Sequence, residues 1–357
     1  PQGPAVLYEL TSVVATATSA GYYARIIADH AVRRRLALAG VTVTGMAADL
    51  TVSPAEQVEA ARAAVDAVAS GSVRDVKLIG EELDDTIAEM SEPPVYTETP
   101  WGSINHLVGG LRPRCMYVVG ARPASGKTIF AMNSAVALAS EGFVAVSSLE
   151  MGRAELHKRL ISQLGRVHMS AMVNNALEPA DWDRIADARS RLMGLTISID
   201  DAPGQTLAHV RAHARSTARR AERAGRKLTG VVVDYLQLME STDPRKDRRV
   251  QVGEFSRGMK LIAKEFDCPV IVLSQLNRKS EERHNKKPML SDLRESGDLE
   301  QDADVVFLLS RDAEDPDRSS EVDVIVAKNR HGATGEVTLG WVGHYAAMED
   351  GGADWAP

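Results

Sequence analysis

One eight-residue turn between an apolar run and an apolar helical stretch constrains this chain most. It follows residues 116–120, precedes residues 129–139, and reads Ala121-Arg122-Pro123-Ala124-Ser125-Gly126-Lys127-Thr128. A strand, a tight turn and a helix in that order direct backbone N–H groups at an anion, so the turn predicts a phosphate-binding site for a nucleotide. The residues expected to contact the nucleotide are Ala121, Arg122, Ala124, Ser125, Gly126, Lys127 and Thr128.

Two side chains of this turn have separate expected tasks. Lys127 would reach the β and γ phosphate oxygens, and Thr128 would hold Mg²⁺. Ala121 stands where such loops usually begin with glycine, and Gly120 lies just before it. A Gly-Lys-Ser/Thr triplet by itself also occurs by chance in ordinary turns, and the strand and helix around it favour nucleotide binding.

The pattern after residue 116 is one of short apolar runs separated by longer helical stretches. This pattern indicates an α/β domain with a largely parallel sheet. The expected strands are residues 116–120, 144–149, 196–199, 231–233, 270–273, 305–309, 322–327 and 335–341. The last two are expected to form a terminal hairpin, with residues 328–332 as a turn outside the sheet.

The first part of the chain has a different character. Residues 1–92 are rich in alanine and show helical periodicity. We expect a helical hairpin over residues 1–72, a linker helix and connector over residues 73–96, and the α/β domain over residues 97–357. Pro93-Pro94 would end the linker helix.

Composition limits the possible classes of protein. Of 357 residues, 44% are hydrophobic and 25% charged, which excludes a collagen or a largely disordered chain. No apolar run approaches the ~20 residues that a bilayer span requires, so we expect no membrane partner. Cys115 and Cys268 have no metal-ligand or disulfide spacing, which favours two buried thiols in a cytoplasmic protein. The chain begins with Pro1 rather than Met, which suggests a fragment or a processed form.

Three polar residues follow apolar runs where ligands bind in open α/β sheets. Asp234 is expected to organise Mg²⁺, although an aspartate there can also cap a helix. Glu150 is expected to deprotonate the attacking water, the alternative being an ordinary acid at a helix start. Gln275 is expected to bond the γ-phosphate and the water, unless it is a surface turn residue.

Six segments together resemble the motor domain of DnaB-type replicative helicases over about residues 97–345. Besides the phosphate-binding turn, they are Ser148-Leu149-Glu150-Met151, Val233-Asp234-Tyr235-Leu236-Gln237-Leu238, Leu273-Ser274-Gln275-Leu276-Asn277-Arg278, Leu290-Ser291-Asp292-Leu293-Arg294-Glu295-Ser296-Gly297 and Ala327-Lys328-Asn329-Arg330. The resemblance implies a RecA-like core in a homo-hexamer that moves 5′ to 3′ on single-stranded DNA and unwinds forked DNA. It also implies a primase and a helicase loader as partners, and a linker helix that docks on the adjacent motor domain. The globular head with which the family usually begins would be missing.

The resemblance assigns further residues. Lys328 and Arg330 would act on ATP in the neighbouring subunit. Without the resemblance, they would be interpreted as solvated charges of a hairpin. Arg294, Glu295 and Gly297 would belong to a pore loop that grips the DNA backbone, the alternative being a flexible polar loop. The run 279–287 would line the same channel or form a disordered tip.

The basic stretch 211–227 is ambiguous, and we interpret it as a solvated or subunit-facing surface rather than a DNA stripe. His209 and His213 lack a ligand cluster, so no metal beyond Mg²⁺ is expected. Two other functions are considered: a recombinase or regulatory ring ATPase that binds DNA without unwinding, and a scaffold that holds ATP as a structural ligand. The pore-loop and Lys-x-Arg segments disfavour the first, and a water-activating Glu150 disfavours the second.

Overall fold

A computed structural model describes residues 20–49, 52, 54–70, 78–241, 243, 245–277, 287–293, 297–312 and 315–351. The chain divides into two compact units, Pro1–Pro93 and Pro94–Pro357. Among the helices of the described residues, none is both long and apolar enough to cross a bilayer.

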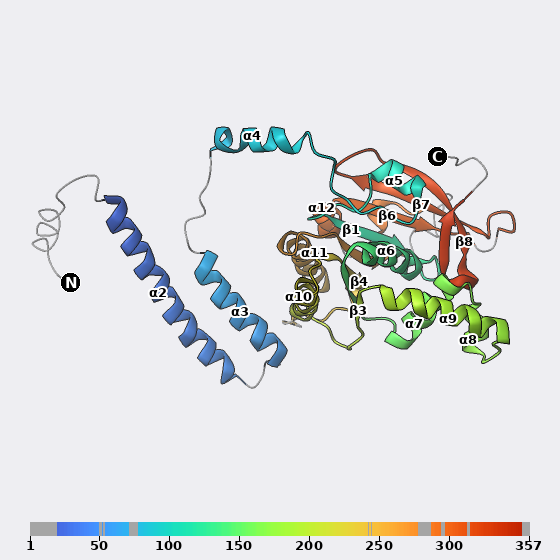
Figure 1. Cartoon of the computed structure of the whole chain (residues 1–357), viewed down its shortest axis with the longest axis horizontal. Helices are drawn as coiled ribbons and strands as arrows, with labels where there is room; N and C mark the ends of the chain where they lie inside the picture. Colours follow the sequence, from blue (N-terminus) through green and yellow to red (C-terminus); the bar gives the residue numbers. More distant parts are fainter. Residues whose placement is uncertain are drawn as a thin grey trace, which may run out of the picture. The chain divides into compact units, whose positions relative to one another are not determined.

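The first unit is helical (Figure 1). Helix α2 (Ala20–Ala47) packs against α3 (Pro54–Ser70), and α4 (Ile79–Glu89) follows in the chain. Ala39 on α2 and Val68 on α3 are buried. The Gln57 amide donates to the carbonyl oxygen of Met46 at 3.0 Å, which ties the start of α3 to the end of α2.

The second unit contains a nine-stranded sheet in the order β3-β2-β4-β5-β1-β6-β7-β8-β9. The strands are β1 (Met116–Ala121), β2 (Phe143–Ser148), β3 (Ile197–Asp200), β4 (Leu228–Asp234), β5 (Val270–Gln275), β6 (Val305–Ser310), β7 (Glu321–Asn329), β8 (Gly335–Val342) and β9 (Ala347–Asp350). The pairs from β3 to β6 are parallel, and those from β6 to β9 are antiparallel. The predicted α/β fold with a mostly parallel sheet and a terminal hairpin is therefore confirmed.

Two details differ from the expectation. The hairpin turn is shifted, because β7 continues to Asn329 and β8 begins at Gly335, so Lys328 lies within a strand. In addition, β9 pairs with β8 and was not predicted.

Helices cover both faces of the sheet (Figure 1). They are α5 (Gly102–Val108), α6 (Lys127–Glu141), α7 (Arg153–Gly165), α8 (Met169–Val173), α9 (Pro179–Gly194), α10 (Leu207–Arg223), α11 (Arg248–Glu265) and α12 (Gly297–Asp302), with 3-10 turns η2 (Leu236–Leu238), η4 (Leu290–Asp292) and η5 (Gly343–Tyr345). Successive residues of β1 alternate between the faces: Tyr117 and Val119 join the core of α5, α6 and α7, whereas Met116 and Val118 join the core of α10 and α11. A strand buried on both faces reads as a continuous apolar run, which is why β1 was recognisable.

Candidate active site

The phosphate-binding turn joins β1 to α6 through backbone conformations that favour glycine. Gly126 precedes α6 with φ 90°, and Ala124 has φ 63°. A Cβ at Gly126 would collide with the side chains of Trp341 and Met348, so this position accepts no side chain. The turn therefore presents its N–H groups and the start of α6 at the carboxyl ends of the parallel strands, as predicted for phosphate binding.

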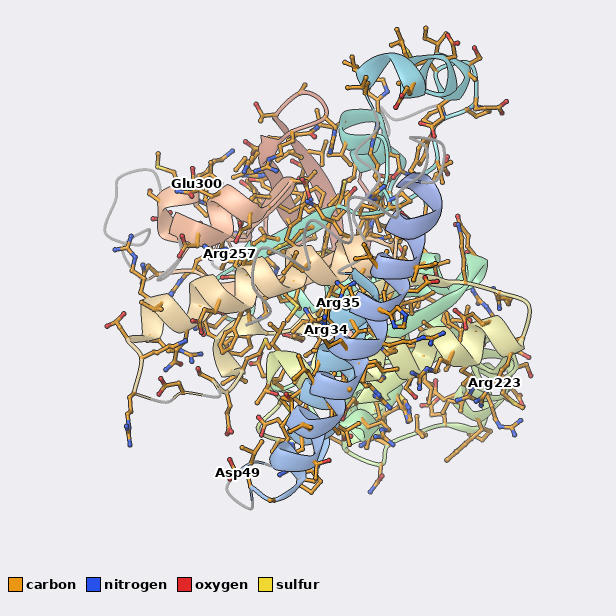
Figure 2. The ribbon with its side chains drawn as sticks, turned by 90° about the vertical axis from the view of Figure 1, so that its left-hand side faces the viewer. Arg34, Arg35, Asp49, Arg223, Arg257 and Glu300 are labelled. Atoms are coloured by element: carbon orange, nitrogen blue, oxygen red, sulfur yellow. The ribbon has the colours of Figure 1, made fainter. Side chains whose placement is uncertain are left out.

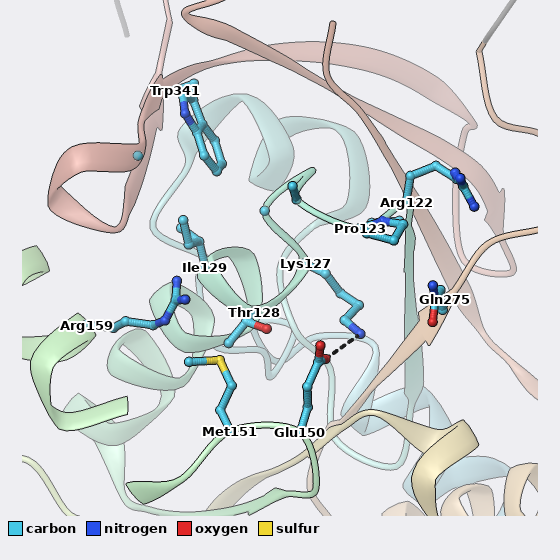
Figure 3. Close-up of a pocket in the computed structure, with 14 residues that line it drawn as sticks. Arg122, Pro123, Lys127, Thr128, Ile129, Glu150, Met151, Arg159, Gln275 and Trp341 are labelled. Atoms are coloured by element: carbon cyan, nitrogen blue, oxygen red, sulfur yellow. Dashed lines mark hydrogen bonds and ion pairs between the residues drawn. The ribbon is translucent and has the colours of Figure 1, made fainter. Parts of the chain in front are cut away.

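Lys127 is fixed by groups from three segments. Its Nζ lies 3.5 Å from Glu150 Oε2, 3.5 Å from Asp234 Oδ1 and 3.8 Å from the centre of the Tyr235 ring. Figure 3 shows the Lys127 and Glu150 side chains pointing toward one another. The sequence reasoning placed both carboxylates here but gave Tyr235 no task; an aromatic residue directly after a strand-ending aspartate was the available clue.

Thr128 and Asp234 form the second polar pair. The Thr128 hydroxyl donates to Asp234 Oδ2 at 2.7 Å, and Asp234 is only 3% exposed. Asp234 Oδ1 is buried and accepts no hydrogen bond from the described residues. A hydroxyl, a carboxylate and an unused carboxylate oxygen are the hard donors that suit Mg²⁺, so these residues fit the ion expected of them.

Gln275 ends β5 beside Ala121 of β1. Gln237 supports this end of the strand, because its amide nitrogen donates to Ser274 Oγ at 2.8 Å and its oxygen accepts from the Gln275 N–H at 3.4 Å. Arg122 donates to the Leu276 carbonyl oxygen at 3.1 Å, which ties the phosphate-binding turn to the same segment. The ends of β1, β4 and β5 are therefore coupled by hydrogen bonds.

These residues surround a cleft of about 350 Å³ (Figure 3). Its lining residues are Ala121, Arg122, Pro123, Ala124, Gly126, Lys127, Thr128, Ile129, Glu150, Met151, Arg159, Gln275, Trp341 and Gly343. The volume suits a small-molecule ligand. Met151, Arg159, Trp341 and Gly343 were not assigned to the site. Met151 lies in a segment that carries the family resemblance but was given no role, whereas Arg159 of α7, Trp341 of β8 and Gly343 of η5 belong to no motif.

Lys328 and Arg330 lie at the other edge of the sheet. Val306 pairs with Lys328 and Val305 with Tyr117, so both cations lie near the beginnings of β1 and β6, whereas the cleft lies at the strands' ends. The Lys328 ammonium donates to the carbonyl oxygens of Glu300 and Gln301 on α12. Helix α12 packs along α11, and the labels Glu300 and Arg257 mark these two helices in Figure 2. Burial, followed by the charge of Arg330, lowers the pKa of Lys328.

The predicted pore loop is described only in part. Arg294 and Glu295 lie outside the described residues, whereas Gly297 begins α12. Of the run 279–287, only Lys287 is described; it bonds Glu336 and lies 3.8 Å from Asp323.

Most of the basic stretch 211–227 belongs to α10, and part of its charge is paired within the chain. Arg211 and Arg215 lie 3.2 and 2.6 Å from the carboxylate of Glu265 on α11. His213 contacts the hydroxyls of Ser147 at 3.4 Å and Ser198 at 2.9 Å, and His209 bonds Thr206.

The fold and the cleft define a RecA-like P-loop ATPase: a mostly parallel sheet with a phosphate-binding turn and two carboxylates, Glu150 and Asp234, at its strand ends. Comparison with known proteins narrows the class. Residues 97–350 match the family described as DnaB-like helicase C terminal domain. The chain therefore belongs to the DnaB-like replicative helicases, and it is an ATP-hydrolysing DNA helicase.

Named relatives agree. The replicative DNA helicase DnaB of Leifsonia xyli subsp. xyli (strain CTCB07) is 41% identical over 98% of this chain and 78% of its own length. That of Geobacillus stearothermophilus is 35% identical over 96% and 77%. Among solved structures, a DnaB-like replicative helicase studied with primase matches with TM-score 0.81 and 28% identity over 97% of this chain and 82% of its own. The ATPase domain of G40P matches with TM-score 0.72 and 34% identity over 78% of this chain and 100% of its own.

Proposed function

We propose that six copies of this chain form a ring that hydrolyses Mg²⁺-ATP, moves 5′ to 3′ along one DNA strand and separates the duplex at replication forks. One observation carries the ring: the cleft lies at one edge of the sheet, and the cations Lys328 and Arg330 lie at the other. A cation at the opposite edge serves an ATP site only when a second copy presents it. Successive copies arranged head to tail do so at every interface.

The cleft residues divide the chemistry of hydrolysis. Glu150 accepts a proton from the attacking water, and Lys127 binds the β and γ phosphate oxygens. Mg²⁺ held by Thr128 and Asp234 supplies positive charge to the same oxygens when bound. Gln275 bonds the γ-phosphate and water, and Gln237 transmits its position to the end of β4.

Two cations from the neighbouring copy would stabilise the negative charge of the transition state. Lys328 and Arg330 would leave their bonds to the carbonyl oxygens of α12 and reach the neighbour's phosphates. An arginine supplied in this way accelerates hydrolysis by about 10³ to 10⁵ in phosphoryl-transfer enzymes.

The DNA contact is proposed for the segment at the start of α12. Arg294, Glu295 and Gly297 would grip the backbone of one strand without reading sequence, as a motor crossing any sequence requires. A solved relative is described together with its interactions with primase. We propose that this chain also binds a primase, that a helicase loader places it on DNA, and that it acts in the cytoplasm.

The test is strand separation on forked DNA with either a 5′ or a 3′ loading tail. We expect ATP-dependent unwinding that requires the 5′ tail and disappears in Glu150→Gln. Hydrolysis stimulated by DNA without unwinding of either fork would instead favour the regulatory ring ATPase.

A further inference from the structure

Three potential metal ligands meet at the edge of the sheet opposite the ATP cleft. Cys115 precedes β1, Asp304 precedes β6, and His331 follows β7. Because β1, β6 and β7 are successive strands of the sheet, these ends are neighbours. Among the described residues, this is the one group of His, Cys, Asp or Glu whose ligand atoms all lie within 4.8 Å of one another.

The spacing of the two soft ligands matches a tetrahedral ion. Cys115 Sγ and His331 Nε2 are 3.5 Å apart. Bonds of about 2.3 Å to sulfur and 2.0–2.1 Å to nitrogen at a tetrahedral angle separate those atoms by about 3.5 Å. An ion can therefore bridge Cys115 and His331 with little movement of either side chain.

Asp304 is prepared as the third ligand. It is 3% exposed, and its Oδ2 accepts a hydrogen bond from the Met116 N–H at 2.7 Å and one from Lys260. These bonds orient the carboxylate, as outer partners of metal ligands do. The Arg330 guanidinium, 3.4 Å from Oδ1, is the group that must give way to an ion.

Access and donor chemistry also suit a metal. Cys115 is buried, while His331 is exposed in the turn after β7, so an ion enters through the histidine. The Cys115 thiol binds an ion as the thiolate, so its proton leaves to water as the ion binds. Sulfur, imidazole and carboxylate donors favour Zn²⁺ over Mg²⁺.

We propose that Cys115, His331 and Asp304 bind a Zn²⁺-like thiophilic divalent cation, with water in the fourth position. The site is distinct from the Mg²⁺ position at Thr128 and Asp234. Sequence spacing gives no hint of it, because the fold brings together residues 216 positions apart.

Co²⁺ is the probe, added to the full chain after treatment with a chelator. We expect one Co²⁺ per chain with thiolate-to-metal charge-transfer absorption, displaced by Zn²⁺. Cys115→Ser should abolish this absorption, and Cys268→Ser, at the other buried cysteine, should retain it. No absorption in the unaltered chain, or its persistence in Cys115→Ser, would overturn the proposal.

A second variant guards against a folding defect in Cys115→Ser. His331→Gln changes an exposed turn residue and should weaken Co²⁺ binding at least tenfold, whereas His157→Gln, at an exposed histidine on α7, should leave it unchanged. Equal Co²⁺ affinity in both variants would exclude His331 as a ligand and overturn the site.

A consequence rests on the proposed function of Arg330. An ion held by His331 and Asp304 ties the turn that carries Arg330 to the sheet and restricts its reach to a neighbouring copy. Addition of Zn²⁺ at a low concentration should therefore slow DNA-stimulated hydrolysis severalfold in the unaltered chain and not in His331→Gln. The Co²⁺ absorption does not depend on hydrolysis. Failure of the site and failure of the assigned role of Arg330 are therefore separate results.

Discussion

Lys127 holds two carboxylates with different environments. Asp234 is buried and bonded to Thr128, whereas the side chain of Glu150 is 49% exposed. An exposed ion pair contributes little to stability, so its pairing with Lys127 leaves Glu150 open to water, as the proposed role of a base requires. Asp234 is held in place, as the proposed role of a metal ligand requires. The two proposed roles therefore differ in their exposure to water.

This difference predicts the behaviour of Glu150→Gln. The amide cannot accept the water's proton, so the rate constant for hydrolysis should fall by about 10² to 10⁴. Nucleotide affinity should change less than threefold or so, because Lys127 and the turn remain. Turnover and equilibrium binding of a fluorescent ATP analogue measure the two quantities. Glu254→Gln is the matched control, because Glu254 pairs with Lys246 outside the cleft. A turnover of Glu150→Gln within twofold of that of the unaltered chain would exclude Glu150 as the base.

His213 provides a pH test of the fold. Burial lowers the pKa of His213 from 6.5, so the folded state prefers the neutral ring between Ser147 and Ser198. The neutral ring makes its full contribution to the free energy of unfolding above about pH 6.5. This contribution is lost as the pH falls toward the folded-state pKa, because the unfolded chain takes up a proton there first.

We therefore expect the free energy of unfolding to decrease below about pH 6.5, and to decrease less in His213→Gln. The variant should also be about 1 kcal/mol less stable at neutral pH because it loses a hydrogen bond. Urea unfolding at about pH 7.5 and about pH 5.5 measures both, with His106→Gln as the control. An identical pH dependence in His213→Gln and the unaltered chain would contradict this account.

At the same scale, sequence was sufficient where the grouping of residues is local. Gly126, Lys127 and Thr128 lie within one turn, so their spacing alone predicted that they would line one cleft. Trp341, which lies against Gly126, comes from the far end of the chain. It was missed because β8 and β9 reach the phosphate-binding turn only through the packing of β9 against α6. The bonds of Arg330 to Asp304 were equally invisible, because they depend on the register of β6 with β7.

Among the elements, strands that read as continuous apolar runs were predictable. Strands, or parts of strands, that contain glycine or polar residues were not. β5 reads as continuous apolar residues, whereas β4 begins earlier than expected because Thr229 and Gly230 hide its start. A Cβ at Gly230 would approach Leu138 of α6 to 2.7 Å, so the glycine permits helix packing rather than breaking the strand. β9 has only four residues and ends in Glu349 and Asp350, so no apolar run marks it.

Helix α4 carries an apolar face that its own unit does not cover. Ile79, Leu83 and Ile87 follow one another at intervals of four and are 87%, 49% and 53% exposed. The motor unit has an apolar groove of about 340 Å³ between α7, α9 and β3, lined mainly by Leu, Ile and Met. We propose that α4 of one copy binds this groove of the next copy.

The corresponding prediction is that Leu83→Glu weakens ring assembly. A charge in an apolar contact should lower the affinity between copies at least tenfold or so, measured as loss of the largest species in sedimentation velocity. Ala88→Glu adds the same charge to the opposite, exposed side of α4 and should not change assembly. Equal dissociation by both variants would show that charge, not the apolar face, matters.

For the whole molecule, the proposed catalytic groups lie at two opposite edges of the sheet. Lys127, Glu150 and Asp234 occupy the strand ends, whereas Arg330 follows β7 near the strand beginnings. With the proposed roles, such a chain carries both halves of an ATP site but does not bring them together within itself. Activity would then be a property of interfaces, and inactive chains with different defects should complement one another.

Mixing Glu150→Gln with Arg330→Ala tests this. Each variant alone should hydrolyse ATP at least 10²-fold more slowly, because every interface lacks a base or a cation. In an equimolar mixture, an interface is intact when an Arg330→Ala chain supplies Glu150 and a Glu150→Gln chain supplies Arg330. Random assembly makes about a quarter of interfaces intact.

Recovered DNA-stimulated hydrolysis in the mixture, measured against each variant alone, is the expected outcome. A mixture of Glu150→Gln with Lys127→Ala is the control, because both changes lie in the same half of the site and no arrangement of copies restores an interface. Equal activity in the two mixtures would mean that Arg330 acts within its own chain. The geometry argues against this, because Arg330 bonds Asp304 at the edge of the sheet from which the strands lead away toward the cleft.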